Sequence, residues 1–498
     1  MDGWNELQIL AAKMPPPLSD EEWLLRMLAR NMDTVIGRQY GFSSMKSGED
    51  YRRRLPLHDY DRLRPHIDRL AEGEENVLFQ GSAVACELTS GSRGGPSKLI
   101  PYSRESLLDF RQAVLPWLAR LAEQYQLRGR ALWSISPVNR RQTQTGGGLP
   151  IGLADYQYLG SEAARCFLEL SALPFWVADS DRVEDWRLAC LYHLLRAVDL
   201  SLVFVWSPTF FLGLLDGLEV HRVELLELLG RGGRLGGRTL DPDPQAVRRL
   251  EQYRGDTRIL WPELKLISAW ADAASEPFAR QLAARCPQAA LEGKGLLSTE
   301  GVVSIPSAAG WPRLAEGCGF FEFLSGSGRV ELPSELESGE TYQVVLTTSG
   351  GLYRYVTGDK VICRGFGGGR PLLSFLGRAD LVSDLVGEKL DEAFVAQCLA
   401  PIPGFRVLVP AVEPAPHYLL VMEAAEPESA QLAQAVEKGL RANPHYDYAR
   451  ELGQLGPLEI VTGRNLMHRY LDWAARHSAA PLGAVKIPSL TLNSDWLN

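Results

Sequence analysis

The chain has 498 residues, of which 45% are hydrophobic and 23% are charged, and its formal net charge is −9. A chain of this length exceeds one compact core, so we expect two or more domains, and the composition is ordinary for a globular protein. The acidic balance gives no indication of a nucleic-acid-binding surface, although a few lysines and arginines in a cleft can still attract an anionic substrate.

The cysteines and the N-terminus indicate a cellular compartment. Seven cysteines are scattered singly, which fits neither a zinc site nor a full disulfide framework. We expect free thiols in a reducing compartment. The N-terminus, MDGWNELQIL, has no signal-peptide pattern, and the most apolar stretch is interrupted by His193, Arg196, Asp199 and Pro208. We therefore expect a cytoplasmic protein without a membrane segment.

The first 80 residues are predicted to be helical. Three prolines at 15–17 end a first helix, and Ser19 is a plausible N-cap for the next one, in SDEEWLLRMLARN. The run NVLFQGSAVACELTSG then predicts a strand followed by a glycine-rich turn. A helix begins near Ser103, where apolar residues recur at helical spacing, and Pro116 is expected to kink it.

Short apolar runs alternate with helices in the middle of the chain. We predict buried strands in ALWSISPV, SLVFVWSP, LKLISAW and AALEGKGLL, with the helix EPFARQLAARC between the last two. Strands that alternate with helices predict a largely parallel α/β core. Between Gly319 and Cys363 the runs FFEFL, GRVEL, TYQVVLTTSG and LYRYVTGDKVICR predict an antiparallel or barrel-like subdomain.

The composition changes again from about Leu381. Three candidate strands are GFRVLVPAVE, HYLLVMEAAE and LEIVTG, and PESAQLAQAVEKGLRAN is an amphipathic helix between the last two. This is enough for a small α+β domain. We therefore predict a large N-terminal domain over residues 1–380 and a small C-terminal domain over residues 381–498.

The first motif that indicates chemistry is TSGSRGGPSK, from Thr89 to Lys98, between a strand and a helix. Glycines let a backbone approach phosphates closely, hydroxyls and amides bind the phosphate oxygens, and a lysine offsets their charge. The residue order differs from GxxxxGK[ST], and on composition alone a surface loop rich in glycine and serine fits equally well.

Three further motifs follow along the chain. LLSTEG places Glu300 after an apolar strand, where it either holds a polar ligand or belongs to a turn or capping box. GLYRYVTGDKV offers the ring of Tyr353 to a base and the carboxylate of Asp359 to ribose hydroxyls, or it is an alternating strand with a Gly-Asp turn. FLGRADLVSDLVGEKLDE brings Arg378 and Lys389 to the predicted domain boundary.

In order and spacing these motifs together resemble the adenylate-forming superfamily. The most similar group within it is the auxin-responsive-promoter family of acyl-acid amido synthetases, of which the chain resembles a bacterial-like member. TSGSRGGPSK has the length of that family's phosphate loop, and WPELKLISAW, GKGLLSTEGVVSIP, LGPLEIV and GAVKIP resemble other blocks of the family. The resemblance extends over about residues 80–490.

The resemblance implies an α/β fold, in which a large adenylating domain with parallel sheets and a β-barrel-like subdomain precedes a small mobile α+β domain. It implies ATP and Mg²⁺ as cofactors, and a ligase that joins a small carboxylic acid to an amine or amino acid through an acyl-adenylate. The catalytic residues that it implies are Lys98, Lys389 and Lys486, and the metal ligand is Glu300. The residues that it implies for ATP and AMP are Ser90, Gly91, Ser92, Arg93, Ser298, Thr299, Glu300, Tyr353, Asp359 and Arg378.

The phosphate loop and the acyl pocket are less closely defined. Arg93 stands where the family usually has a small hydroxyl residue, which adds a charge and removes a phosphate contact. Arg140 and Arg141 are candidates for a substrate carboxylate, although a solvated basic turn is the simpler interpretation. Candidates for the acyl pocket are Trp133, Leu149, Ile151 and Tyr156, for each of which core packing is the alternative.

Two other functions stay open. A ligase that delivers the acyl group to coenzyme A or to a carrier protein would use the same first half-reaction and the same fold. A non-catalytic homologue would only bind a nucleotide or an acyl ligand; Arg93 leaves this open, whereas Lys98, Glu300, Asp359 and Lys389 together argue against it. We expect a monomer or weak dimer, without a nucleic-acid or membrane partner.

Overall fold

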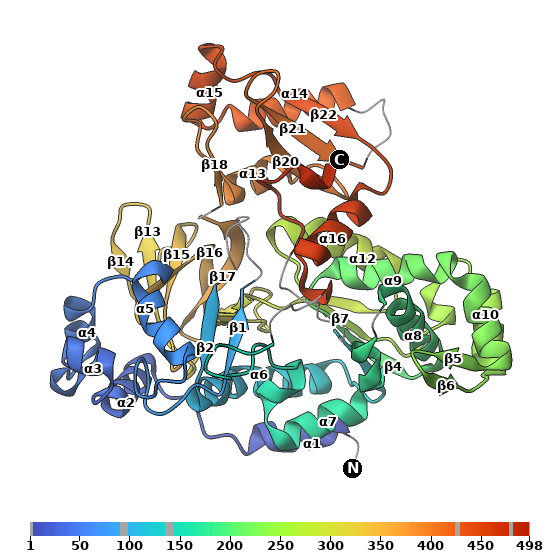
Figure 1. Ribbon diagram of the computed structural model, residues 1–498, viewed down its shortest axis with the longest axis horizontal. Coiled ribbons are helices and arrows are strands. Elements are labelled where there is room, and N and C mark those ends of the chain that lie inside the picture. Colours follow the sequence, from blue (N-terminus) through green and yellow to red (C-terminus); the bar gives the residue numbers. More distant parts are fainter. Residues whose placement is uncertain are drawn as a thin grey trace.

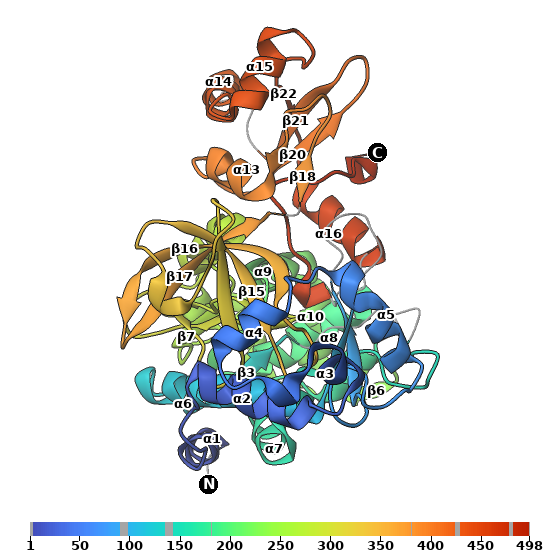
Figure 2. The same ribbon diagram turned by 90° about the vertical axis from the view of Figure 1, so that its left-hand side faces the viewer.

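The computed structural model describes residues 3–89, 98–134, 143–180, 182–379, 381–423, 429–477 and 482–497. A large N-terminal part carries a smaller C-terminal part, which stands above it in Figure 1 and in the side view of Figure 2. Within the described ranges, no helix combines the length and apolarity needed to cross a membrane.

A four-stranded parallel sheet forms the middle of the large part, in the order β3-β4-β7-β8. Its alternate side chains enter two different cores: Leu202 and Leu266 pack with the helices of one face, whereas Val203 and Ile267 pack with those of the other. Both faces are therefore buried, which confirms the predicted parallel α/β core. The four strands are β3 (Arg130–Trp133), β4 (Leu200–Phe204), β7 (Leu266–Ala269) and β8 (Ala290–Gly293).

Helices cover both faces of this sheet (Figure 1). The first face is covered by α1 (Gly3–Ala12), α6 (Arg104–Gln124) and α7 (Ser161–Leu170). The second face is covered by α8 (Val183–Arg196), α9 (Pro208–Val220), α10 (Arg222–Arg231), α11 (Pro244–Gln252) and α12 (Glu276–Arg285). Ser103 caps α6 as expected, and Pro116 lies inside that helix.

A seven-stranded sheet lies beside the parallel one, in the order β11-β12-β17-β16-β15-β13-β14. Every pairing in it is antiparallel, which confirms the predicted antiparallel subdomain. The strands are β11 (Ser304–Ile305), β12 (Arg313–Leu314), β13 (Phe320–Ser325), β14 (Val330–Glu331), β15 (Thr341–Thr347), β16 (Tyr355–Gly367) and β17 (Arg370–Arg378).

The N-terminal helices pack against the start of the antiparallel sheet. Ser19 and Glu22 form a reciprocal capping box on the second helix, as the sequence predicts. The helices are α2 (Asp20–Asn31), α3 (Val35–Tyr40), α4 (Gly48–Arg54) and α5 (Tyr60–Ala71). A hairpin of β1 (Ala85–Leu88) and β2 (Leu99–Tyr102) follows them and leads into α6.

The C-terminal part is a three-stranded sheet with helices packed against it. β20 (Arg406–Ala411) and β21 (His417–Met422) are antiparallel, and β22 (Glu459–Thr462) adds in parallel to β21. These are the three predicted strands. The helices of this part are α13 (Glu392–Leu399), α14 (Ser429–Leu440), which was predicted, α15 (Pro444–Glu451) and α16 (Leu466–His477).

The chain after α16 runs back between the two parts, and we call residues 482–491 the tail. At one end, the carbonyl of Gly483 accepts a hydrogen bond from the backbone N–H of Ser207 in the large part, at 3.2 Å. At the other end, the carbonyl of Ser489 accepts one from Leu408 on β20, at 2.8 Å. The tail therefore joins the large part to the C-terminal sheet.

Candidate active site

Glu300 lies in the turn of a tight hairpin. Its strands are β9 (Leu297–Ser298) and β10 (Gly301–Val302), and Ser298 pairs with Gly301, so Thr299 and Glu300 form the turn. The carbonyl of Thr299 accepts a hydrogen bond from the Tyr102 hydroxyl at 2.6 Å. Glu300 is buried, which is unusual for a turn carboxylate. The hairpin therefore holds a carboxylate beside the strand that leaves the phosphate loop.

Asp359 and Arg378 face each other on neighbouring strands. They are direct partners in the register of β16 and β17, and Nη1 of Arg378 lies 3.3 Å from Oδ1 of Asp359. The guanidinium also donates to the carbonyl of Thr357 at 3.0 Å. Asp359 is buried, whereas a fifth of the Arg378 side chain is exposed. The ion pair thus places a carboxylate and a guanidinium together at the end of β17.

Lys486, in the C-terminal tail, lies near the strand that carries Arg378. Its ammonium lies 4.6 Å from the ring centre of Trp270 and 5.9 Å from that of Phe375. Although Lys486 is exposed by residue surface, desolvation by the protein atoms around its ammonium lowers its pKa, as does the charge of Arg378, while the charges of Asp359, Glu392 and Glu300 act to raise it. Lys486 therefore lies close enough to these carboxylates to be influenced by their charge.

Four of the predicted site residues are thus brought together from three distant segments. We call Glu300, Asp359, Arg378 and Lys486 the polar cluster. Trp270, beside it, directly follows β7, so the cluster lies by the carboxyl end of a parallel strand. Ligands of open α/β sheets bind at this edge. A lysine ammonium over aromatic rings, within the electrostatic influence of carboxylates and an arginine, is an arrangement that can bind and stabilise phosphate and carboxylate groups.

Lys98 and the ends of the phosphate loop lie on the hairpin of β1 and β2. Thr89 and Lys98 are joined by a backbone hydrogen bond of 2.9 Å, which closes the loop between them. The ammonium of Lys98 donates to the hydroxyl of Tyr355 at 3.0 Å and lies 5.7 Å from the ring centres of Tyr60 and Tyr355. The ammonium of Lys98 thus lies beside two tyrosine side chains. The loop residues Ser90, Gly91, Ser92 and Arg93, and also Arg140 and Arg141, lie outside the described residues.

Lys389 is not brought to the polar cluster. It is exposed, in the turn between β18 (Val382–Ser383) and β19 (Leu390–Asp391), and its φ of 46° is left-handed. Lys486 and Lys389 are both exposed by residue surface; they differ in their neighbours, since the ammonium of Lys486 lies over Trp270 whereas Lys389 stands in the turn between β18 and β19. A contact of Lys389 with substrate stays a prediction.

Tyr353 requires a correction. Its side chain is fully buried, its ring packs 5.3 Å from that of Phe42, and its hydroxyl donates to the carbonyl of Leu78. The amide of Asn31 also donates to this hydroxyl. The ring leaves no exposed face for a base, so the expected adenine contact is wrong and Tyr353 is a core residue.

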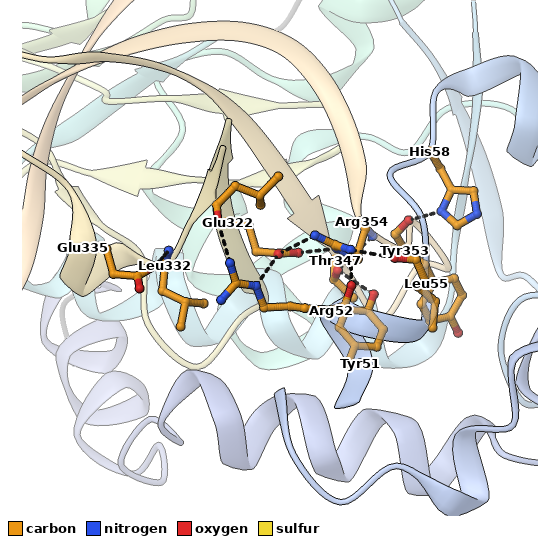
Figure 3. A network of polar contacts seen from close by, with 11 residues as sticks. Tyr51, Arg52, Leu55, His58, Glu322, Leu332, Glu335, Thr347, Tyr353 and Arg354 are labelled. Carbon is orange, nitrogen blue, oxygen red and sulfur yellow. Dashed lines mark hydrogen bonds and ion pairs between the residues drawn. The ribbon is translucent and has the colours of Figure 1, made fainter. Parts of the chain in front are cut away.

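The residue that follows Tyr353 explains why this motif is rigid (Figure 3). Arg354 is buried with a φ of 45° and binds Glu322 through two parallel hydrogen bonds of 2.8 Å. It also donates to the carbonyls of Arg52 and Leu55 on and after α4, at 2.6 Å each. This network fastens the start of β16 to the N-terminal helices, and Asp359 follows five residues later in the same strand.

The acyl-pocket candidates fall into two groups. Trp133 is buried, and its ring stacks on Phe167 with centres 4.0 Å apart, so its expected place in a pocket is wrong and it is a core residue. Ile151 is buried next to Cys86 on β1. Leu149 and Tyr156 are half-buried. For Leu149, Ile151 and Tyr156 an acyl contact stays a prediction.

Two tryptophans that sequence reasoning did not select lie at the carboxyl ends of the parallel strands. Trp206 follows β4 and Trp270 follows β7, their ring centres are 5.9 Å apart, and both are half-buried. Phe375, on β17, completes the surroundings of Lys486. Their position at the ends of two predicted parallel strands was a usable signal, because that edge is where ligands bind.

Comparisons with known proteins agree with this geometry. The GH3 family N-terminal domain matches residues 8–291, its central domain residues 313–378 and its C-terminal domain residues 386–495. A probable indole-3-acetic acid-amido synthetase, GH3.4 of Oryza sativa subsp. japonica, is 26% identical over 92% of this chain and 83% of its own. The jasmonoyl-L-amino acid synthetase JAR6 of Nicotiana attenuata is 24% identical over 91% of this chain and 87% of its own. These relatives are plant proteins, so a bacterial-like character stays a prediction.

Solved structures share the fold. An acyl acid amido synthetase, AtGH3.15 in complex with 2,4-DB, is 21% identical, with a TM-score of 0.82 over 96% of this chain and 92% of its own. A 2-hydroxyisobutyryl-CoA ligase in the postadenylation state is 14% identical, with a TM-score of 0.52 over 99% of this chain and 89% of its own. With matches to all three of its domains along the sequence, the chain belongs to the GH3 family.

Proposed function

We propose that the protein is an ATP-dependent acyl-acid amido synthetase. It activates a carboxylic acid as an acyl-adenylate and transfers the acyl group to an amine or amino acid. Membership of the GH3 family and the names of the relatives support this activity. The observation that carries it is the position of Lys486, whose ammonium the tail holds over the rings of Trp270, which follows β7, and Phe375, which lies three residues before Arg378 on β17.

The polar cluster has the groups that adenylation needs. The Asp359 carboxylate would accept hydrogen bonds from the two ribose hydroxyls, and its ion pair with Arg378 orients that carboxylate. An oxygen of the substrate carboxylate attacks the α-phosphorus of ATP, the bond to the β-phosphate breaks, and pyrophosphate leaves. Lys486 would stabilise the negative charge that develops on the α-phosphate, because the tail places its ammonium over Trp270, at the carboxyl end of a parallel strand.

The second step needs an acceptor rather than a new charge stabiliser. The nitrogen of the amine attacks the acyl carbon, the bond to the phosphate oxygen breaks, AMP leaves, and the amine loses a proton. Binding of both reactants in one site supplies most of the advantage of such a reaction. Lys389 is exposed in this arrangement, so any contribution from it requires a different orientation of the C-terminal part.

The acid is proposed to lie along the edge of the parallel sheet. Lys486 would mark the place where the reacting carboxylate and the α-phosphate meet. In space, Trp270 lies beside Lys486, and Trp206 lies beside Trp270. Two half-buried indoles offer an apolar surface, which favours an acid with an aromatic or other apolar body. Leu149, Ile151 and Tyr156 remain candidates for the far end of this pocket.

Glu300 is the proposed ligand for Mg²⁺. Magnesium that accompanies a nucleotide is commonly held by one or two carboxylates together with the phosphates, so a single buried carboxylate fits this task. Among the residues that the structure describes, no group of three or more His, Cys, Asp or Glu is placed to hold a metal ion. When bound, the ion would supply positive charge to the phosphates.

ATP–pyrophosphate exchange over a panel of aryl, indolyl and fatty acids tests the first step. Mass spectrometry of reactions with a mixture of amino acids and coenzyme A then identifies the acceptor. We expect exchange with at least one acid and an amide as the product. A thioester product would assign the chain to the coenzyme A ligases. No exchange with any acid, by protein shown to be folded, would overturn the proposal in favour of a non-catalytic homologue.

A further inference from the structure

We infer that Glu392, at the start of α13, is a positioning residue that holds the tail in the orientation that brings Lys486 to the polar cluster. The inference rests on the proposed function, since it concerns the step in which Lys486 acts. It predicts that Glu392 matters for adenylate formation and not for acyl transfer. Asp391, its neighbour, forms a second contact across the same junction.

Glu392 binds two segments that are distant in sequence. Its carboxylate accepts a hydrogen bond from the backbone N–H of Ser489 in the tail, with Oε1 3.3 Å from that nitrogen. It also accepts one from the backbone N–H of Arg378 at the end of β17. One side chain of the C-terminal part thus joins the last strand of the large part to the tail.

The tail bond lies close to the catalytic lysine. Ser489 is three residues after Lys486, a span of about 10 Å in extended chain. The tail is fixed at Gly483 by its bond to Ser207, and on the other side of Lys486 the backbone of Ser489 is held by Leu408 through its carbonyl and by Glu392 through its N–H. A lysine between two fixed points keeps its ammonium in one place, which electrostatic stabilisation requires.

Charge as well as geometry links Glu392 to the site. The Glu392 carboxylate is among the negative charges that act on Lys486, and Lys486 and Arg378 in turn act on the pKa of Glu392. The carboxylate thus offsets part of the repulsion between two neighbouring cations, Lys486 and Arg378. A neutral side chain of the same shape would keep one hydrogen-bonding oxygen but lose this compensation.

A second contact crosses the junction beside the first. Nζ of Lys360, on β16 next to Asp359, lies 3.3 Å from Oδ2 of Asp391. The other oxygen of Asp391 caps α13 by accepting from the N–H of Phe394 at 3.1 Å. About a quarter of each side chain in the ion pair is exposed, at 24% and 26%. Such a pair is weakly stabilising, so it adds only a little to the contacts that hold the junction.

The backbones at this junction lie unusually close together. A Cβ added to Gly377, the residue before Arg378, would lie 3.0 Å from Cα of Ala393 on α13. The φ of Gly377 is 138°, which side chains rarely permit. α13 therefore packs directly on the end of β17. This close packing positions Glu392, the first residue of α13, next to the tail.

The test compares the two half-reactions in Glu392→Gln. We expect ATP–pyrophosphate exchange to fall at least tenfold through kcat, with little change in KM for ATP. Transfer from synthetic acyl-adenylate to the amine should stay within twofold of the original protein. Glu451→Gln, an exposed carboxylate on α15 in the same part of the chain, is the matched control and should change neither step.

A double variant shows whether Glu392 acts through Lys486. In the Lys486→Ala background, Glu392→Gln should cause no further loss of exchange, because the group that it positions is absent. If Lys486→Ala alone leaves too little exchange to compare, the ratio of the two half-reactions in Glu392→Gln decides. Equal losses in both half-reactions, or a further tenfold loss in the double variant, would overturn the inference.

Lys360→Gln provides a second route that leaves α13 and its cap intact. It removes the partner of Asp391, and we expect a smaller loss, about two- to threefold, in adenylate formation only. If Glu392→Gln fails to fold, Lys360→Gln tests the inference instead. An unchanged exchange rate in Lys360→Gln would then contradict the inference that contacts between α13 and β17 position the tail. Failure of the original protein in exchange would instead overturn the proposed function itself.

Discussion

The ammonium of Lys486 lies over the indole of Trp270, 4.6 Å from its ring centre. Trp270 directly follows the third strand of the parallel sheet, and Lys486 lies in the tail beyond the C-terminal sheet, so more than two hundred residues separate them in sequence. Their contact exists only while the C-terminal part is docked on the large one. It defines the arrangement to which the proposed adenylation step belongs.

Trp270→Ala should impair adenylate formation. Contacts between a partly desolvated ammonium and an indole contribute about 1–2 kcal/mol, so we expect roughly a tenfold loss in kcat/KM for the acid. Trp270→Phe keeps a ring face and should retain most of the activity. Pyrophosphate exchange at varied acid concentration measures both variants. Full activity in Trp270→Ala would mean that the indole supports neither Lys486 nor the acid.

Asp359→Ala should weaken nucleotide binding at least tenfold. A carboxylate that accepts two hydrogen bonds from ribose loses both, and each charge-assisted bond contributes about 1.5–3 kcal/mol. Removal of the carboxylate also leaves the Arg378 guanidinium without this ion-pair partner. Titration calorimetry with ATP measures the affinity, and a thermal melt checks the fold. Unchanged affinity in a folded variant would place the ribose elsewhere.

Glu322→Gln should destabilise the protein without changing the substrates that it uses. Glu322 is almost fully buried and binds both Arg354 and Arg52, so its neutralisation leaves a buried guanidinium without a counter-charge (Figure 3). Breaking one partner of a buried pair costs about 3–5 kcal/mol. Urea unfolding measures the loss. The control is Arg329→Met, in which the replaced side chain is 77% exposed and the expected change is small. Equal unfolding midpoints for Glu322→Gln and the original protein would contradict the stabilising role of Glu322.

His193 should make the protein sensitive to mild acid. Burial, with the nearby charges of Arg196 and Arg130, lowers the pKa of His193 to about 4. The unfolded chain, with an ordinary histidine pKa of about 6.5, then binds more protons between pH 6.5 and 4, so stability falls as the pH falls through this window.

His193→Phe should reduce that loss. The side chain packs against the rings of Tyr192 and Trp176, which an aromatic replacement can still contact. At about 1.4 kcal/mol per pH unit, His193 accounts for about 3 kcal/mol at pH 4. Unfolding free energies at pH 7 and pH 4.5 measure the effect, with the exposed His468→Gln as control. An identical acid dependence in His193→Phe would show that other groups cause it.

The fold could be predicted from the sequence to a large extent because its signals are local. Apolar runs of strand length gave β4 and β7, and the Ser19 capping box gave the start of α2. Within the site, Asp359 and Arg378 were found through their motifs and are register partners in the sheet. Motif reasoning works for such residues because a single hairpin places them.

The predictions that were wrong or incomplete concern residues whose surroundings are formed by distant segments of the chain. Tyr353 is enclosed by Asn31, Phe42 and Leu78, which come from helices and loops about three hundred residues earlier. The local sequence pattern around an aromatic residue is the same whether its ring faces a ligand or packs in a core. Glu392 was missed for a similar reason, since its bond to Ser489 depends on how the tail returns across the junction.

The measurement that tests the account most directly is the effect of Lys486→Ala on each half-reaction. Loss of the positive charge proposed to stabilise the α-phosphate should slow pyrophosphate exchange about a hundredfold. Transfer from synthetic acyl-adenylate to the amine should change little, because the negative charge that Lys486 stabilises develops in the first step. Equal losses in both steps would contradict the assignment of Lys486 to adenylation, and a loss confined to the second step would reverse it.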